Sequence, residues 1–327
     1  MAVNTDKELL RVKDLYINFY TYEGVVKAID GVSFHIHHNE TFALVGETGC
    51  GKSVTARSIL RLIPTPPGKI EGGEILFNGV DLLKIPEKEM LEYRGKKISM
   101  IFQEPMTSLN PVFTVGDQLV ETIALNQRVG KEEAYNIALE MLERVRIPDA
   151  ENAMTKYPHE FSGGQRQRIV IAMALSCNPS LLIADEPTTA LDVTVQAQII
   201  NLMDELQKNT GTSILLITHD LGVVAEMSDR VAVMYAGNIV ELGTTSAIFE
   251  KRYHPYTRGL FNAIPVFGKG KQTRLEEIPG SVPNLLYPPP GCRFHPRCPH
   301  VMDICRKEKP ELMEVEPGHH VRCHLYR

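Results

Sequence analysis

A glycine-rich octapeptide, Gly46-Glu47-Thr48-Gly49-Cys50-Gly51-Lys52-Ser53, constrains the fold more than any other part of the 327-residue sequence. It follows a short apolar run, Thr41 to Val45, and precedes a segment with helical spacing of its apolar residues. In a strand, glycine loop and helix of this order, backbone N–H groups converge on an anion at the positive end of the helix. Lys52 can then reach the β- and γ-phosphates of a nucleotide, and the hydroxyl of Ser53 can ligate Mg²⁺. The sequence therefore predicts a phosphate-binding site in an α/β domain.

Two further apolar runs end in polar residues, as buried strands of a parallel sheet do. Leu181 to Ala184 leads into Asp185 and Glu186, and Ile214 to Thr218 leads into His219. Unbroken apolar runs are typical of strands that are covered on both faces. A carboxylate at the end of such a strand is well placed to organise Mg²⁺, and Glu186 beside it can polarise a water molecule.

The composition excludes several classes of protein. Hydrophobic residues make up 43% and charged residues 23%, which excludes wholesale disorder. The net charge of −5 argues against a nucleic-acid binder, which usually has a basic excess. The apolar runs are far shorter than the roughly 18 residues that a membrane span needs, and the first residues do not predict a secretion signal.

The composition changes at about residue 255. The part from Pro255 onward holds 11 of the 21 prolines and 11 basic against 7 acidic residues. We therefore expect a nucleotide-binding domain over residues 1–255 and an extension over residues 256–327. Helical periodicity over residues 116–147 predicts a helical insert, within a helical subdomain of about residues 104–175. Residues 265–291 are rich in proline and predict an extended connector.

Four of the six cysteines lie in this extension: Cys292, Cys298, Cys305 and Cys323. In a chain without secretion signals such a cluster favours a metal site over disulfides. Four thiolates can hold either Zn²⁺ or a [4Fe–4S] cluster, and the spacing alone does not decide between them. The neighbouring basic residues Arg293, Arg297, Arg306 and Lys307 are expected to offset the charge of the thiolates. A short, proline-rich tail would gain stability from such a metal.

Further motifs occur in a fixed order between residues 40 and 220. Phe161-Ser162-Gly163-Gly164-Gln165 resembles the signature motif of ATP-binding cassette (ABC) ATPases, with Phe161 in place of the usual leucine. Gln103, after an apolar run, resembles the glutamine of the Q-loop, and Ala190-Leu191-Asp192 resembles the D-loop. His219 is similar to the switch histidine. With the phosphate-binding loop, these motifs identify the chain as a member of the ABC ATPases.

The resemblance implies a fold and a set of roles. The fold is a P-loop ABC cassette with a parallel-sheet core, an antiparallel β subdomain and a helical subdomain, followed here by the small Cys-rich extension. Glu186 is the implied general base, assisted by His219 and Gln103, and Asp192 couples two ATP sites. Ser162, Gly163, Gly164 and Gln165 are implied to contact the ATP of a second subunit. The residues implied to bind ATP and Mg²⁺ are Tyr22, Gly46, Glu47, Thr48, Gly49, Cys50, Gly51, Lys52, Ser53, Val54, Gln103 and Asp185, with Tyr20 as an alternative to Tyr22 for stacking on adenine.

Two segments are similar to the dipeptide and oligopeptide importers within this family. They are Gln103 to Pro111 and the extension that begins at His254-Pro255-Tyr256-Thr257 and continues through Cys298. This resemblance implies a peripheral ATPase on the cytoplasmic face of the membrane, paired with a second ABC ATPase subunit. It also implies two transmembrane permease subunits and an extracytoplasmic peptide-binding protein, and it favours [4Fe–4S] over Zn²⁺. The isolated chain could also form a homodimer.

Two alternatives stay open at this stage. Nickel importers share these motifs, so the cargo could be nickel. The chain could instead be a soluble ABC ATPase of DNA repair or translation with a regulatory metal tail. Translation factors usually have two cassettes and repair proteins have long coiled coils, whereas the sequence shows one cassette and no heptad repeat. The transport ATPase is therefore the favoured hypothesis.

Overall fold

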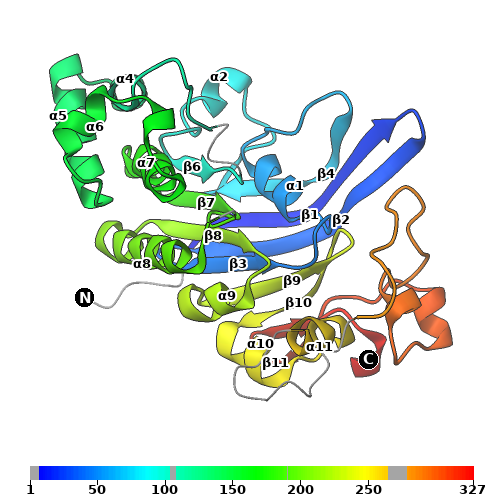
Figure 1. Cartoon of the computed structure of the whole chain (residues 1–327). Helices are drawn as coiled ribbons and strands as arrows, with labels where there is room; N and C mark the ends of the chain where they lie inside the picture. Colours follow the sequence, from blue (N-terminus) through cyan, green and yellow to red (C-terminus); the bar gives the residue numbers. More distant parts are fainter. Residues whose placement is uncertain (1–6, 104–107, 190, 264–277) are drawn as a thin grey trace. The chain divides into compact units, whose positions relative to one another are not determined.

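The structure is a computed structural model that describes residues 7–103, 108–189, 191–263 and 278–327 (Figure 1). Within these residues the chain divides into two compact units. The first unit is formed mainly by Lys84–Ile217, together with His37–Glu40. The second unit is formed by Glu8–Ile36, Thr41–Leu83 and Thr218–Arg327.

Three parallel strands form the sheet of the first unit. β7 (Leu181–Asp185) lies between β6 (Ile98–Ile101) and β8 (Ser213–Thr218) and pairs in parallel with both. Every residue of β7 and β8 is buried, which explains why both runs are almost entirely apolar. The two strands predicted from the apolar runs are therefore confirmed.

Helices make up the rest of the first unit. α4, α5, α6 and α7 contact one another and lie together in Figure 1. The helical periodicity over residues 116–147 thus corresponds to two helices. Arg128 adopts a left-handed conformation (φ 59°) that ends α4, and α5 begins after Gly130. The helices are α2 (Glu87–Met90), α4 (Val115–Gln127), α5 (Lys131–Arg144), α6 (Ala150–Thr155), η1 (Pro158–Glu160), α7 (Gly163–Leu175) and α8 (Val193–Thr210).

The second unit has an antiparallel sheet with the strand order β2-β1-β4-β5. The strands are β1 (Glu8–Thr21), β2 (Gly24–His37), β4 (Gly68–Phe77) and β5 (Val80–Asp81). Buried and exposed residues alternate along much of β1, as expected of a sheet with one face in the core.

A second set of strands in this unit carries the phosphate-binding loop. β3 (Thr41–Val45) is wholly buried and pairs in parallel with β9 (Arg230–Tyr235), which pairs antiparallel with β10 (Asn238–Thr244). β12 (His319–Val321) pairs with β10, and β11 (Met313–Glu316) pairs with β12. The C-terminal residues therefore continue the sheet of this unit. Their strands are too short and too polar for periodicity to have predicted them.

The helices of the second unit are short. They are α1 (Lys52–Ile59), α9 (Leu221–Met227), α10 (Thr245–Lys251), α11 (Pro255–Asn262), η2 (His295–Arg297), η3 (Asp303–Arg306) and η4 (His324–Tyr326). An aromatic cluster joins them to β9: the ring of Tyr235 lies 4.6 Å from that of Tyr256 and 5.1 Å from that of Phe294. All three rings are buried, so the extension shares a hydrophobic core with β3 and β9.

Among the described residues, no helix combines the length and the apolar character needed to cross a bilayer.

Candidate functional site

The phosphate-binding loop lies between β3 and α1. Gly46, Gly49 and Gly51 all have positive φ (153°, 81° and 109°), a conformation that side chains rarely adopt. A Cβ on Gly46 would meet the carbonyl oxygen of Met234 at 2.1 Å, so this position also lacks space for a side chain. The glycines of the motif are therefore required by backbone geometry, as predicted.

Lys52 is folded back onto the loop. Its ammonium group donates hydrogen bonds to the carbonyl oxygens of Gly46 (2.8 Å) and Glu47 (3.2 Å), and the residue is only 5% exposed. The side chain of Ser53 belongs to the first turn of the same helix, and Val54 follows it, both half-buried. The two carbonyl groups thus hold the ammonium group at the loop, where an anion would bind.

A cavity of about 520 Å³ opens beside the loop. Residues Val45 to Thr48 line one part of it, and His219 to Gly222 line another, with Leu260 and Ala263. His219 directly follows β8, and Asp220 begins α9 by accepting hydrogen bonds from the N–H groups of Gly222 (2.8 Å) and Val223 (3.4 Å). The structure therefore brings the phosphate-binding loop and the predicted switch histidine to one cavity.

The predicted acidic residues lie at the end of β7 in the first unit. Asp185 is the last residue of the strand and is fully buried. Glu186 has a left-handed backbone (φ 50°), and its carboxylate accepts hydrogen bonds from the amide of Gln103 and the hydroxyl of Thr189, both at 3.0 Å. Gln103 and Glu186 are thus brought together, and Thr189 is a neighbour that the motif analysis missed.

The signature motif forms the start of α7. Ser162 is the N-cap: its hydroxyl accepts from the N–H of Gln165 (3.3 Å), and its own N–H donates to the Gln165 side chain (3.0 Å). This capping box holds the N–H groups of the first turn at an exposed helix end. A Cβ on Gly164 would lie 2.6 Å from Val195, so the glycine is required by close packing.

Asp192 begins α8 by accepting from the N–H of Val195 (3.0 Å). Since Val195 also packs against Gly164, the D-loop and the signature motif are neighbours within the first unit. Ala190 and residues 104–107, which carry parts of the D-loop and of the importer-like Q-loop, lie outside the described residues. So does the first part of the predicted connector, residues 265–277.

The two candidate adenine residues have different environments. Tyr20 lies near the end of β1, and its hydroxyl donates to Glu71, which raises the pKa of the phenol. Tyr22 lies in the turn between β1 and β2, and its side chain is fully exposed. Tyr22 therefore has the more accessible ring.

The thiols of the four cysteines of the extension interact electrostatically with one another. Burial raises the pKa of Cys292 to about 12, and the charges of the other three thiols also raise it. Burial likewise raises the pKa of Cys298 and Cys323, and each of these two thiols interacts electrostatically with Cys305. Among the residues that the structure describes, however, no group of three or more His, Cys, Asp or Glu side chains is arranged to hold a metal ion.

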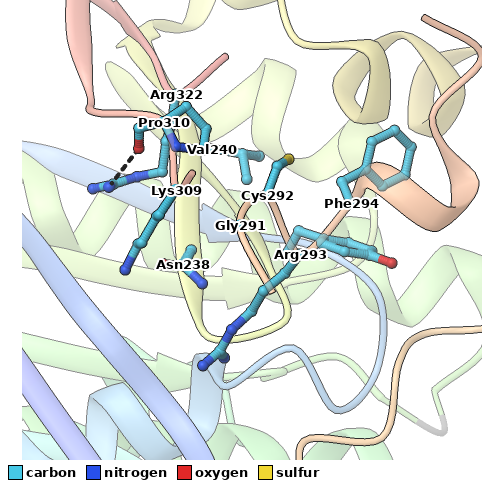
Figure 2. Close-up of a pocket in the computed structure, with 10 residues that line it drawn as sticks. Asn238, Val240, Gly291, Cys292, Arg293, Phe294, Lys309, Pro310 and Arg322 are labelled. Atoms are coloured by element: carbon cyan, nitrogen blue, oxygen red, sulfur yellow. Dashed lines mark hydrogen bonds between the residues drawn. The ribbon is translucent and has the colours of Figure 1, made fainter. Parts of the chain in front are cut away.

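Arg293 and Arg297, which lie beside these cysteines, form ion pairs with carboxylates. The expectation that they offset the charge of the thiolates is therefore wrong for these two residues. The guanidinium of Arg293 donates to the carbonyl of Ala236 (2.6 Å) and pairs with Asp30 (3.3 Å). Figure 2 shows it pointing away from the thiol of Cys292, past a cavity of about 20 Å³ that has room for a single water molecule. Arg297 pairs with Glu47 instead. Both arginines are only 7–8% exposed, and their partners are so distant in sequence that no local pattern could have predicted these contacts.

Comparisons with known proteins agree over almost the whole chain. The family described as "ABC transporter" matches residues 29–189, and the family described as "Oligopeptide/dipeptide transporter, C-terminal region" matches residues 240–305. The probable peptide ABC transporter ATP-binding protein y4tR of Sinorhizobium fredii is 54% identical over 96% of this chain and 94% of its own. The oligopeptide transport ATP-binding protein OppD of Bacillus subtilis is 55% identical over 97% of this chain and 88% of its own.

Solved structures are similar over the cassette. A dimeric structure of a post-hydrolysis state of the ATP-binding cassette MJ0796, bound to ADP and Pi, has a TM-score of 0.65 and 26% identity, covering 72% of this chain and 98% of that chain. The structure of cbiO1 from Clostridium perfringens, part of the ABC transporter complex cbiONQ, has a TM-score of 0.64 and 28% identity, covering 76% of this chain and 92% of that chain.

Proposed function

The chain belongs to the ATP-binding proteins of peptide ABC transporters, and we propose that it hydrolyses ATP to drive the import of dipeptides or oligopeptides. The observation that carries this proposal is the cavity of about 520 Å³, which has the phosphate-binding loop at one part of its wall and His219 at another. The relatives are named for peptides, which favours peptide cargo over nickel and a transporter over a soluble repair or translation factor.

The residues of the second unit are proposed to bind the nucleotide. The loop from Gly46 to Ser53 holds the phosphates through its N–H groups and Lys52, and Val54 continues this contact into α1. His219 contacts the γ-phosphate across the cavity. Tyr22, with its exposed ring, stacks on adenine in preference to the hydrogen-bonded Tyr20. The free ammonium charge of Lys52 and the positive end of α1 support these roles.

The residues of the first unit are proposed to perform hydrolysis. Glu186 accepts the proton of the attacking water, and Gln103 and Thr189 orient its carboxylate. Oxygen donors suit Mg²⁺, and Ser53 and Asp185 are the residues that would hold it, where the ion would neutralise phosphate charge.

The signature residues are proposed to act on a second subunit. Ser162, Gly163, Gly164 and Gln165 present an exposed, capped helix end, which is an anion site by itself. Hydrolysis then requires two ATPase subunits face to face, with Asp192 linking the two sites. Support comes from the similar cassette MJ0796, which is dimeric in its ADP and Pi-bound structure.

The proposed assembly follows from the family. It consists of this chain, a second ABC ATPase subunit, two transmembrane permease subunits and an extracytoplasmic peptide-binding protein, with the ATPases on the cytoplasmic face of the membrane. We propose that residues 1–255 form the nucleotide-binding domain, with the helical subdomain at about 104–175, and that residues 256–327 form the extension. A homodimer is proposed only for the isolated chain.

The four cysteines are proposed to hold a [4Fe–4S] cluster, with Zn²⁺ as the alternative. The donor set of four thiols supports a metal. A single tetrahedral Zn²⁺ would draw its sulfurs closer together than a cluster does, since each Zn–S bond is only about 2.3 Å. Among the described residues no group of three or more His, Cys, Asp or Glu side chains is arranged to hold a metal ion, so the proposal rests on the chemistry of the donor set.

Nucleotide binding by the purified chain tests the proposal. Lys52→Ala is expected to abolish saturable ATP binding, because it removes the buried ammonium at the centre of the loop. Lys208→Ala is the matched control: this exposed lysine pairs with Asp204 on α8 and is expected to leave binding unchanged. Equal ATP affinity in wild type and Lys52→Ala would refute the proposed nucleotide site.

A further inference from the structure

One arginine of the C-terminal extension reaches the phosphate-binding loop. The guanidinium of Arg297 donates two hydrogen bonds to the carboxylate of Glu47, at 2.7 and 3.1 Å. Glu47 is the second residue of the loop, between Gly46 and Thr48. The two residues are 250 positions apart, and the paired geometry is the strongest that a guanidinium and a carboxylate can form.

Arg297 is itself rigidly held. Its side chain is 5% exposed, and its other donors bond to the carbonyl oxygens of Pro279 (2.9 Å) and Ile278 (3.3 Å). Its guanidinium also lies 5.7 Å from the centre of the Tyr235 ring. Burial alone would lower the pKa of Arg297, but the hydrogen bonds to Glu47 and Tyr235 raise it above its usual value. The arginine is therefore a fixed positive charge.

The extension also holds the backbone of the same loop residue. The N–H of Glu47 donates to the hydroxyl of Tyr256 (2.9 Å), which is fully buried beside Phe294. Side chain and backbone of Glu47 are thus fixed by two different residues beyond position 255. Only Glu47 among the loop residues carries a negative charge, and its carboxylate is 29% exposed.

The charge of Glu47 matters for the ligand. A nucleoside triphosphate carries several negative charges, and a carboxylate in the loop that binds it repels them. Arg297 neutralises this carboxylate and holds it against the extension. Without the arginine, the loop would present an uncompensated negative charge at the cavity that Glu47 lines.

We propose that Arg297 is a positioning residue for nucleotide binding, which makes the C-terminal extension a working part of the ATP site. It acts through Glu47, by neutralising its charge and fixing the loop, and it does not touch the nucleotide. This inference rests on the proposed function. It also gives the extension a role at the phosphate-binding loop that does not depend on what the four cysteines hold.

The test measures the Kd of a fluorescent ATP analogue for the 327-residue chain and for variants that change the charge of Arg297 or Glu47. Arg297→Met is expected to raise the Kd at least about tenfold, because the carboxylate of Glu47 is left uncompensated. Glu47→Gln removes that charge, so the double variant Arg297→Met with Glu47→Gln is expected to bind within about threefold of Glu47→Gln alone. Arg297→Lys keeps the charge but loses the paired geometry, so it is expected to raise the Kd less than Arg297→Met does. In the assembled transporter, Arg297→Met is expected to raise the KM for ATP and leave kcat unchanged.

Arg322→Met is the matched control for loosening of the extension. Arg322 also belongs to the extension and bonds to the carbonyl oxygens of Ile239 (3.0 Å) and Pro310 (3.2 Å), but to no residue of the loop. It is expected to lower Tm without changing the Kd for the analogue.

The outcomes separate the two proposals. Absence of saturable binding in wild type would refute the proposed function itself. With wild type binding, an unchanged Kd in Arg297→Met, or an equal rise in Arg322→Met, would overturn the role of Arg297. Should Arg297→Met not fold, the double variant decides, because it leaves no unpaired carboxylate. A tenfold weaker affinity of the double variant than of Glu47→Gln would show that Arg297 does not act through Glu47.

Discussion

The side-chain amide of Gln103 donates a hydrogen bond of 3.0 Å to the carboxylate of Glu186, 83 residues further along the chain. The hydroxyl of Thr189 donates to the same oxygen, also at 3.0 Å. The two donors thus orient the carboxylate. A carboxylate oriented in this way is suited to accept a proton from a water molecule.

Replacement of Glu186 is expected to separate ATP binding from hydrolysis. Glu186→Gln keeps the shape of the side chain but removes its basicity, so the ATPase rate of the assembled transporter should fall by about 10²- to 10⁴-fold. Binding of ATP should persist, and an ATP-bound pair of subunits should accumulate, as size-exclusion chromatography with ATP would show. A turnover rate like that of wild type would refute the assignment of the base.

The N-cap of the signature helix should contribute both stability and activity. Ser162→Ala removes the hydroxyl that accepts from Gln165 and should lower the free energy of unfolding by about 1 kcal/mol. Thr244→Ala removes a similar N-cap from α10, where the hydroxyl accepts from the N–H of Ala247 (3.3 Å), and should cost a similar amount. Only Ser162→Ala should also reduce ATPase activity. Equal activity of the two variants would contradict a role of Ser162 at the ATP of a second subunit.

Stability is expected to depend on pH through His254. This side chain is fully buried and accepts from the N–H of Tyr256 (3.0 Å), and burial lowers its pKa from 6.5 to about 4. Between these values the unfolded chain binds a proton that the folded chain does not, so the free energy of unfolding rises with pH. This residue alone should make the protein roughly 2 kcal/mol less stable at pH 5 than at pH 7.

His254→Asn provides the comparison for this pH dependence. Asparagine is a good N-cap and can accept from the same backbone N–H, but it does not titrate. Urea unfolding at pH 5 and pH 7 should therefore show a smaller difference in the variant than in wild type. The same difference in both proteins would show that His254 is protonated as easily in the folded chain as in the unfolded one.

The metal content of the extension is expected to depend on the cysteines. Anaerobically purified protein should contain about four iron and four sulfide per chain, with the absorption of a cluster, if the four thiols hold [4Fe–4S]. Cys298→Ser should lose both. Cys177→Ser is the control, because this cysteine lies outside the extension in the first unit, and it should keep them. A content of one zinc and no iron per chain would show that the site holds Zn²⁺ instead of the cluster. Absence of both metals would refute the metal site.

Local physics determined much of this protein directly from its sequence. Wholly apolar runs such as Leu181 to Ala184 predict buried strands, as the structure confirms. Glycine is required at position 46 of the loop, where φ is positive and a carbonyl oxygen lies 2.1 Å from a possible Cβ. Their chemistry depends on residues that are adjacent in the chain, so the sequence determined the phosphate-binding loop, the end of β7 and the start of α7.

Only the tertiary structure decided which residues that are distant in sequence contact one another. It joined Gln103 to Glu186 and Glu47 to Arg297, and it placed β12 beside β10. The net charge around the cysteines suggested that Arg297 serves the thiols, whereas its guanidinium is committed to the loop. The sequence shows that a charged residue is present but not which residue it pairs with. That partner depends on how segments far apart in the chain pack together, as with Arg297 and Glu47. The role of the extension at the phosphate-binding loop therefore became visible only in three dimensions.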